Sequence, residues 1–199
     1  MKDTMKALTL CIILLGFVRT AHAEVAPPIV EGFRTATKQS PYEVQGNSIQ
    51  TLVAEMKAKG PLDEGKRFFG KTHWDLRWNY RYEQKEGGFV ITTLMVMADI
   101  QYQMPRRILP PDEADNVAPQ WARFMAALTT HENGHGQNAI QHGKTLYAIL
   151  RAHRVFASAQ ELKNFVKTEG DKCIADANAT DVEYDRKTEH GATQGATLR

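Results

Sequence analysis

The chain has 199 residues and a formal net charge of +2, from 25 basic and 23 acidic residues. Residues 1–23 have the features of a signal peptide: a lysine-containing start, an apolar run over Ala7–Val18 and the small-x-small cleavage site Ala21-His22-Ala23. Cleavage would leave 22 basic and 22 acidic residues, so the mature chain is formally neutral and no nucleic-acid partner is expected. Its 176 residues suit a single domain with a hydrophobic core.

These features predict a periplasmic or secreted protein. The apolar run is short for a bilayer span and no second long run follows it, so no stable membrane span is expected after cleavage. Only Cys173 remains in the mature chain, which excludes an internal disulfide. We expect this cysteine to be a small, buried helix residue and not an activated nucleophile. Nothing in the pattern specifies an oligomeric state.

The first part of the mature chain has few periodic elements. Residues 24–41 contain two adjacent prolines and little periodicity, which indicates a lead-in segment. Residues 42–199 are predicted to form one domain, beginning with a short strand at 42–44. A helix follows, which Asn47 or Ser48 can cap and Gly60-Pro61 ends.

A hairpin is predicted in the middle of the chain. Aromatic or apolar residues alternate with polar residues from Trp74 to Tyr82, which indicates a strand. The polar stretch 83–88 ends in two glycines and predicts the loop, and the partner strand runs from Phe89 to about Tyr102. We expect the aromatic row to pack on helices.

Two long helices complete the predicted α+β fold, an antiparallel hairpin or small sheet packed on long helices. The first begins near Pro119, and its apolar positions keep helical spacing as far as Ile149. Ser158-Ala159-Gln160-Glu161 is a capping box that opens the second helix, which is expected to continue to about Tyr184.

His131-Glu132-Asn133-Gly134-His135 is the only HExxH motif in the chain, and it lies on the apolar stripe of the first long helix. Residues four apart share a helix face, so both imidazoles can bind one zinc ion, Zn2+. Glu132 lies beside them, where a carboxylate can accept a proton from activated water. A catalytic zinc needs a third protein ligand and keeps a fourth position for water.

The third ligand is expected in the C-terminal stretch of the chain. His142 shares the motif's helix face, but the axial rise places it about 10 Å beyond His135, too far for one ion. His190 is the leading candidate, because it is followed by glycine just after a helix that should pack on the motif helix. Glu183 and Asp185 are the alternatives, since a carboxylate from a following helix can also bind zinc.

These features together resemble the bacterial secreted family DUF922, whose members are described as predicted zinc-dependent proteases. The resemblance covers most of residues 42–195. It rests on Lys71-Thr72-His73-Trp74 before the aromatic strand, the hairpin, the HExxH helix and the Tyr-Asp-x-x-Thr-x-His-Gly ending at 184–191. The resemblance implies that the metal ligands are His131, His135 and His190, and that the catalytic residue is Glu132.

The leading hypothesis is a secreted zinc-dependent hydrolase, namely a metallopeptidase acting on peptides or proteins, with cell-wall peptides among the candidate substrates. Residues 42–199 would then form a single zincin-like catalytic domain. Glu132 would act as the general base, and Tyr184 could donate a hydrogen bond to the developing oxyanion or could simply be a packed aromatic. Asp185 could instead orient a ligand histidine. Two alternatives remain: a non-catalytic envelope protein with a structural metal site, and a protein whose buried histidines are hydrogen-bonded without any metal.

Overall fold

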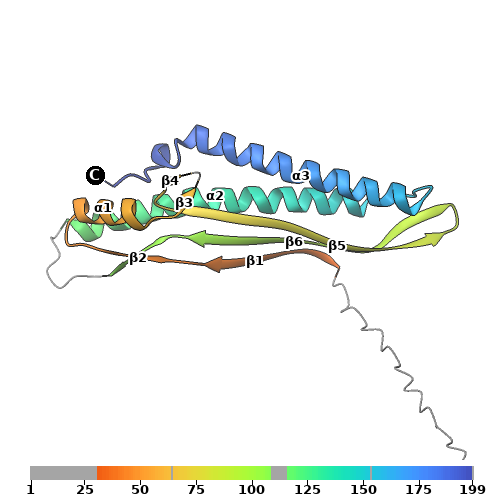
Figure 1. Cartoon of the computed structure of the whole chain (residues 1–199), viewed down its shortest axis with the longest axis horizontal. Coiled ribbons are helices and arrows are strands. Elements are labelled where there is room, and N and C mark those ends of the chain that lie inside the picture. Colours follow the sequence, from red (N-terminus) through yellow and green to blue (C-terminus); the bar gives the residue numbers. More distant parts are fainter. Residues whose placement is uncertain (1–30, 64, 109–115, 153, 199) are drawn as a thin grey trace, which may run out of the picture.

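Two long helices lie along one face of a narrow sheet, which gives the protein an elongated α+β architecture (Figure 1). The computed structural model describes residues 31–63, 65–108, 116–152 and 154–198. The predicted signal peptide therefore lies outside the described residues. Within them, no helix combines the length and the apolar character that crossing a bilayer requires.

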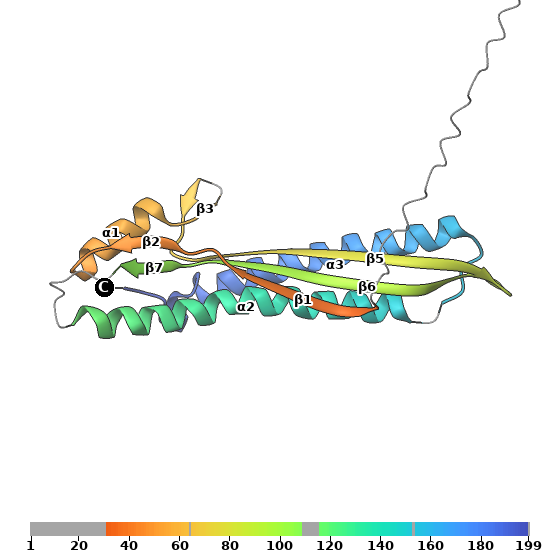
Figure 2. The same cartoon turned by 90° about the horizontal axis from the view of Figure 1, so that it is seen from below.

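The predicted hairpin forms the larger part of the main sheet. β5 (Lys71–Lys85) pairs antiparallel with β6 (Gly88–Gln103), close to the predicted bounds. β1 (Gly32–Gln39) adds to β6 in parallel, so the strand order is β1-β6-β5 (Figure 2). The sequence indicates only a lead-in segment where β1 lies. Most side chains of this strand are exposed, so it lacks the apolar alternation that predicts a strand.

The two long helices pack against each other and run antiparallel. They are α2 (Val117–Arg151) and α3 (Ala159–Thr188). The Ser158 hydroxyl accepts a hydrogen bond from the Glu161 amide at 3.1 Å, which confirms the predicted cap. α3 extends past the predicted end at Tyr184, so the acidic residues near its C-terminus are helical.

The short elements gather around the N-terminal half of α2 (Figure 1). They are β2 (Tyr42–Gln45), α1 (Ile49–Lys59), β3 (Leu62–Asp63), β4 (Lys66–Arg67), β7 (Pro105–Ile108) and the 3-10 helix η1 (Ala192–Gln194). The helix predicted to begin after Ser48 is confirmed as α1, and the Ser48 hydroxyl accepts a hydrogen bond from the amide of Thr51 at 3.3 Å.

Two hydrophobic clusters hold the layers together. The first lies between the long helices and the main sheet, with Leu94 and Leu146 fully buried at its centre. The aromatic row of β5 packs against this cluster, which confirms the prediction for that face. The second joins α1 and the C-terminal segment to the first half of α2 around Leu52 and Phe124. The HExxH motif lies on α2 between the parts of the helix that these clusters hold.

Candidate metal centre

The HExxH motif lies in the middle of α2 and faces the protein interior, as its helical spacing predicts. The exposed fractions of His131, Glu132 and His135 are 4%, 4% and 9%. Because buried polar groups need partners, each of these side chains should have a defined set of contacts.

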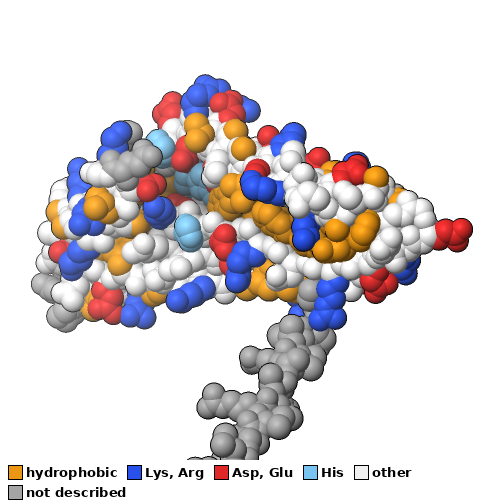
Figure 3. Space-filling view, turned by 45° about the vertical axis from the view of Figure 1, so that its right-hand side comes forward, with side chains coloured by type: hydrophobic (Ala, Val, Ile, Leu, Met, Phe, Trp, Pro, Cys, Tyr) orange, Lys and Arg blue, Asp and Glu red, His pale blue; other side chains and the backbone are white. Residues whose placement is uncertain are grey.

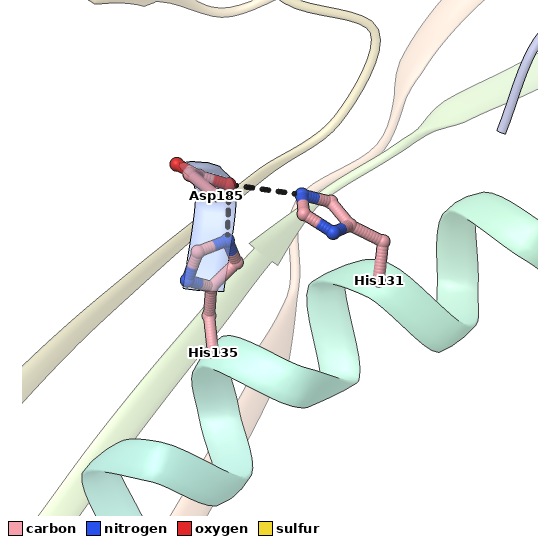
Figure 4. Close-up of side chains that lie close together, drawn as sticks. All are labelled: His131, His135 and Asp185. Carbon is pink, nitrogen blue, oxygen red and sulfur yellow. Dashed lines mark hydrogen bonds and ion pairs between the residues drawn. The ribbon is translucent and has the colours of Figure 1, made fainter. Parts of the chain in front are cut away.

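Asp185 on α3 brings a carboxylate to the two motif histidines. Its Oδ1 atom lies 3.2 Å from Nε2 of His131 and 3.1 Å from Nε2 of His135 (Figure 4). One ligand atom from each of the three residues lies within 4.8 Å of the others, so the group could hold a metal ion. Two imidazole nitrogens and one carboxylate oxygen form a donor set that suits zinc and leaves a position for water.

Each motif histidine also has a partner at its second ring nitrogen. Nδ1 of His135 lies 3.0 Å from Oδ1 of Asp181, and Nδ1 of His131 lies 3.0 Å from Oε1 of Gln194. Metal-binding histidines usually donate their second N–H to a carboxylate or carbonyl oxygen, which fixes the ring and its tautomer. Both rings are thus arranged with Nε2 directed toward Asp185.

Asp181 is a further site residue, which is not among those expected from the sequence. It accepts hydrogen bonds from Nε1 of Trp74 at 2.6 Å and from Nδ2 of Asn138 at 3.1 Å, besides its contact with His135. A sequence signal was available, because Asp181 and Asp185 are four residues apart on α3 and so share one helix face, like the two motif histidines on α2.

Contacts between carboxylates and histidines shift the pKa values of His135 and Asp185. Burial opposes protonation of His135, but hydrogen bonds and charge interactions with Asp181 and Asp185 outweigh it and raise its pKa to about 10. Burial would raise the pKa of Asp185, yet its contacts with His131 and His135 hold that pKa well below the usual range. Asp181 and Asp185 therefore favour positive charge at His135, and the same carboxylates would favour a bound cation.

Glu132 lies beside the group and is held by β5. Its Oε2 atom accepts a hydrogen bond from the hydroxyl of Thr72 at 2.7 Å. Burial raises the pKa of Glu132, although the Thr72 hydrogen bond and the neighbouring histidines oppose this. The chain passes close by at Gly70, where an added Cβ would lie only 2.6 Å from Oε1 of Glu132. The carboxylate is thus buried and oriented, yet it lines a pocket.

That pocket has a volume of about 570 Å3, and its lining includes the side chains of His131, Glu132, His135 and Asp185. Figure 3 shows histidine side chains at this hollow, with hydrophobic side chains beside it. Phe68, Phe69 and Val182 contribute apolar surface to its lining, and Val182 is 71% exposed. The candidate metal centre is therefore accessible from solvent.

His190, the leading candidate for the third ligand, lies at the rim of the pocket. Its side chain is 60% exposed, and its Nδ1 atom is 3.4 Å from Oδ2 of Asp185. Its ring also packs against Phe68, with the ring centroids 5.6 Å apart. Glu183 pairs instead with Arg186 at 2.6 Å. The geometry therefore favours Asp185, one of the two carboxylate alternatives, over His190.

Tyr184 packs behind the two motif histidines. Its ring stacks on His131 with centroids 5.2 Å apart and meets His135 edge-on at 5.0 Å. Its hydroxyl donates to the main-chain oxygen of His131 at 3.3 Å and accepts from Gln194 at 3.1 Å. Tyr184 is not among the described residues that line the pocket. This position favours the packed-aromatic alternative over an oxyanion donor.

The two glycines of the sequence His-Glu-Asn-Gly-His-Gly allow close packing around the motif. An added Cβ at Gly134 would clash with the hydroxyl of Tyr184, and it would lie 2.7 Å from Cε1 of that ring. At Gly136 it would clash with the hydroxyl of Tyr102. Because Gly134 and Gly136 have no side chains, Tyr184 of α3 and Tyr102 of β6 can pack against the backbone of the motif helix.

His142 and Cys173 lie away from the metal group. Nε2 of His142 is 3.0 Å from the hydroxyl of Thr180, and the thiol of Cys173 donates to the main-chain oxygen of His142 at 3.3 Å. Cys173 is 8% exposed in α3, as predicted. Burial raises the pKa of its thiol to about 11, which is the opposite of activation.

The fold and the site together define an α+β protein in which an HExxH helix faces a carboxylate from the next helix. The chain matches the sequence model of a family described as "Bacterial protein of unknown function (DUF922)" over residues 39–191. It belongs to this family, which confirms the resemblance seen in its motifs. No curated protein and no solved structure matches the chain.

Proposed function

We propose that this protein is a secreted or periplasmic zinc-dependent hydrolase, and specifically a metallopeptidase. The observation that carries the proposal is the convergence of His131, His135 and Asp185 on an open pocket, with the carboxylate of Glu132 beside them. Two histidines and one carboxylate form the ligand set of many hydrolytic zinc sites, in which water takes the remaining position.

Zinc supplies Lewis acidity, which activates water and polarises a carbonyl group. Glu132 would accept the proton of the attacking water and deliver it to the departing amine. Its burial raises its pKa, so that it can hold a proton between these two steps. The hydrogen bond from Thr72 keeps one carboxylate oxygen in place while the other remains available for proton transfer.

A purely structural metal site requires a fourth protein ligand. Among the described residues, the group that could hold a metal contains three members. The two further carboxylates nearby are already engaged, Asp181 by Trp74 and His135, and Glu132 by Thr72. This donor count supports a catalytic role over the structural alternative.

The test is the substitution Glu132→Gln, which preserves the shape of the side chain and an acceptor for Thr72 but removes the proton-accepting group. We expect this substitution to lower the rate of peptide hydrolysis by about 10²–10⁴-fold. Zinc content should stay at the wild-type level. Glu86→Gln, at an exposed position in the hairpin loop, is the matched control and should leave hydrolysis unchanged.

The assay would offer a broad peptide panel, including cell-wall peptides, to chelator-treated and zinc-reloaded protein. Full activity of Glu132→Gln would contradict its role as general base. Zinc-loaded wild-type protein that cleaves no member of the panel would instead favour a structural metal site.

A further inference from the structure

The C-terminal segment after α3 contacts the motif helix directly at the candidate metal centre. Gln194 at the end of η1 lies between two site residues: its Oε1 atom is 3.0 Å from Nδ1 of His131, and its Nε2 atom donates to the hydroxyl of Tyr184 at 3.1 Å. The hydroxyl of Tyr184 in turn donates to the main-chain oxygen of His131. These contacts form a closed ring of hydrogen bonds around one face of His131.

The donors in this ring determine which atom of Gln194 faces His131. Because Tyr184 uses its only hydroxyl proton on the main-chain oxygen of His131, it can only accept from Gln194. The NH2 group of Gln194 must therefore face Tyr184, and its carbonyl oxygen faces Nδ1 of His131. An imidazole nitrogen that meets a carbonyl oxygen has to carry the proton.

Thr188, the second neighbour of Nδ1 of His131, also indicates that this nitrogen carries the proton. The hydroxyl of Thr188 lies 3.4 Å from Nδ1 of His131 and donates its proton to the main-chain oxygen of Tyr184 at 2.8 Å. It too can only accept from His131. Both neighbours of Nδ1 are therefore acceptors, so Nδ1 keeps its proton, and Nε2, the atom next to Asp185, is the nitrogen that can give up a proton to bind a metal ion.

The segment that carries Gln194 is packed firmly enough to hold this geometry. Ala196 and Leu198 are buried in the second hydrophobic cluster, and the amide of Ala196 donates to the main-chain oxygen of Gly191 at 3.0 Å. Gly191 itself lies against His131, because an added Cβ there would come within 2.9 Å of Cγ of that ring.

We infer that Gln194 is a positioning residue that fixes His131 in the Nδ1–H tautomer, so that the C-terminal segment 191–198 completes the metal centre. Gln194 lies beyond the region that matches the family model, which ends at residue 191. The inference rests on the metal site of the proposed function, but it does not depend on hydrolysis.

The experiment measures the zinc affinity of the full mature chain by competition with a chromophoric chelator. Gln194→Leu removes both hydrogen bonds at nearly constant volume and should weaken zinc binding by about 10–100-fold. Gln194→Glu keeps an acceptor toward His131 and should stay within a few-fold of wild type. Thr193→Val is the control, since it removes a neighbouring hydrogen bond from Thr193 to the main-chain oxygen of Thr188 without touching His131.

Thermal unfolding of the metal-free variants measures the loss of packing alone, and each loss of zinc affinity is compared with the loss of stability in the same variant. Equal losses of zinc affinity in these two variants would overturn the inference, because general packing of the segment would then explain both. Unchanged zinc affinity in Gln194→Leu would overturn it as well. In either case zinc binding by the wild-type chain would leave the proposed function standing, whereas a wild-type chain that binds no zinc would overturn both.

The tautomer can also be read without any substitution. A long-range 1H–15N spectrum of the zinc-loaded wild-type protein should show Nδ1 of His131 protonated and Nε2 bound to zinc. Zinc on Nδ1 of His131 would overturn the inference, whatever the variants do.

Discussion

Gly134 offers a sharp test of the packing at the motif, because the structure predicts the sign of a stability change. In an open helix position, Gly→Ala stabilises by about 1 kcal/mol through helix propensity. Here the added methyl group would clash with the hydroxyl of Tyr184 and lie 2.7 Å from Cε1 of its ring. The ring cannot move freely, since it stacks on His131 and meets His135 edge-on.

The magnitude follows from three contributions. Overpacking a well-packed site costs about 1–3 kcal/mol. Displacement of the Tyr184 hydroxyl from its partners His131 and Gln194 costs about 1 kcal/mol more. The gain in helix propensity offsets about 1 kcal/mol of this. Gly134→Ala should therefore lower the free energy of unfolding of the metal-free protein by about 1–3 kcal/mol.

Urea denaturation followed by circular dichroism measures this change. Asn133→Ala at the exposed neighbouring position is the control, and it should stabilise by a few tenths of a kcal/mol. In a Tyr184→Ala background, Gly134→Ala should stabilise by about 1 kcal/mol, because the clashing ring is gone. If Gly134→Ala stabilises the wild-type protein by a similar amount, the packing argument is refuted.

Three further predictions concern individual side chains. Loss of a residue that only hydrogen-bonds a metal ligand typically weakens metal binding by about 10–100-fold. In a chelator competition assay, Asp185→Ala should weaken zinc binding by more than this, because it removes a ligand. His190→Ala should weaken it by less than about 10-fold. Asp181→Asn should weaken it by about 10–100-fold in the same assay, because His135 loses a carboxylate partner. Cys173 should resist iodoacetamide at pH 8 in the folded protein and react in urea. Because burial raises its pKa from 9.0 to about 11, its contribution to stability is present below about pH 9 and is lost as the pH rises to about 11, which alkaline denaturation curves can check.

Much of the fold was predictable because its signals are local. The alternation in β5, the Ser158 cap and the helical spacing of the HExxH motif each arise from a single element. β1 was not predictable, because a mostly exposed strand paired on one side carries no such pattern. Its place beside β6 depends on a long-range pairing.

The sequence favours His190 over Asp185 as the third ligand because it predicts a helix end near Tyr184, whereas α3 ends at Thr188. A helix that ended near Tyr184 would leave His190 on a loop that could return to the motif. The observed helix continues to Thr188, which places Asp181 and Asp185 on one helix face toward α2. Glu189 and His190 then adopt left-handed backbone conformations, with φ of 48° and 51°, and the His190 side chain lies at the rim. Gln194 had no local signal, because its role depends on how the C-terminal segment folds back.

X-ray absorption of the zinc-loaded mature chain would show whether His131, His135 and Asp185 hold one catalytic zinc ion. We expect one zinc per chain, with two imidazole nitrogens and oxygen ligands at about 2.0–2.2 Å. A chain that takes up no zinc would rule out this metal centre. A third imidazole in the coordination shell would contradict the assignment of Asp185 and return His190 to the site.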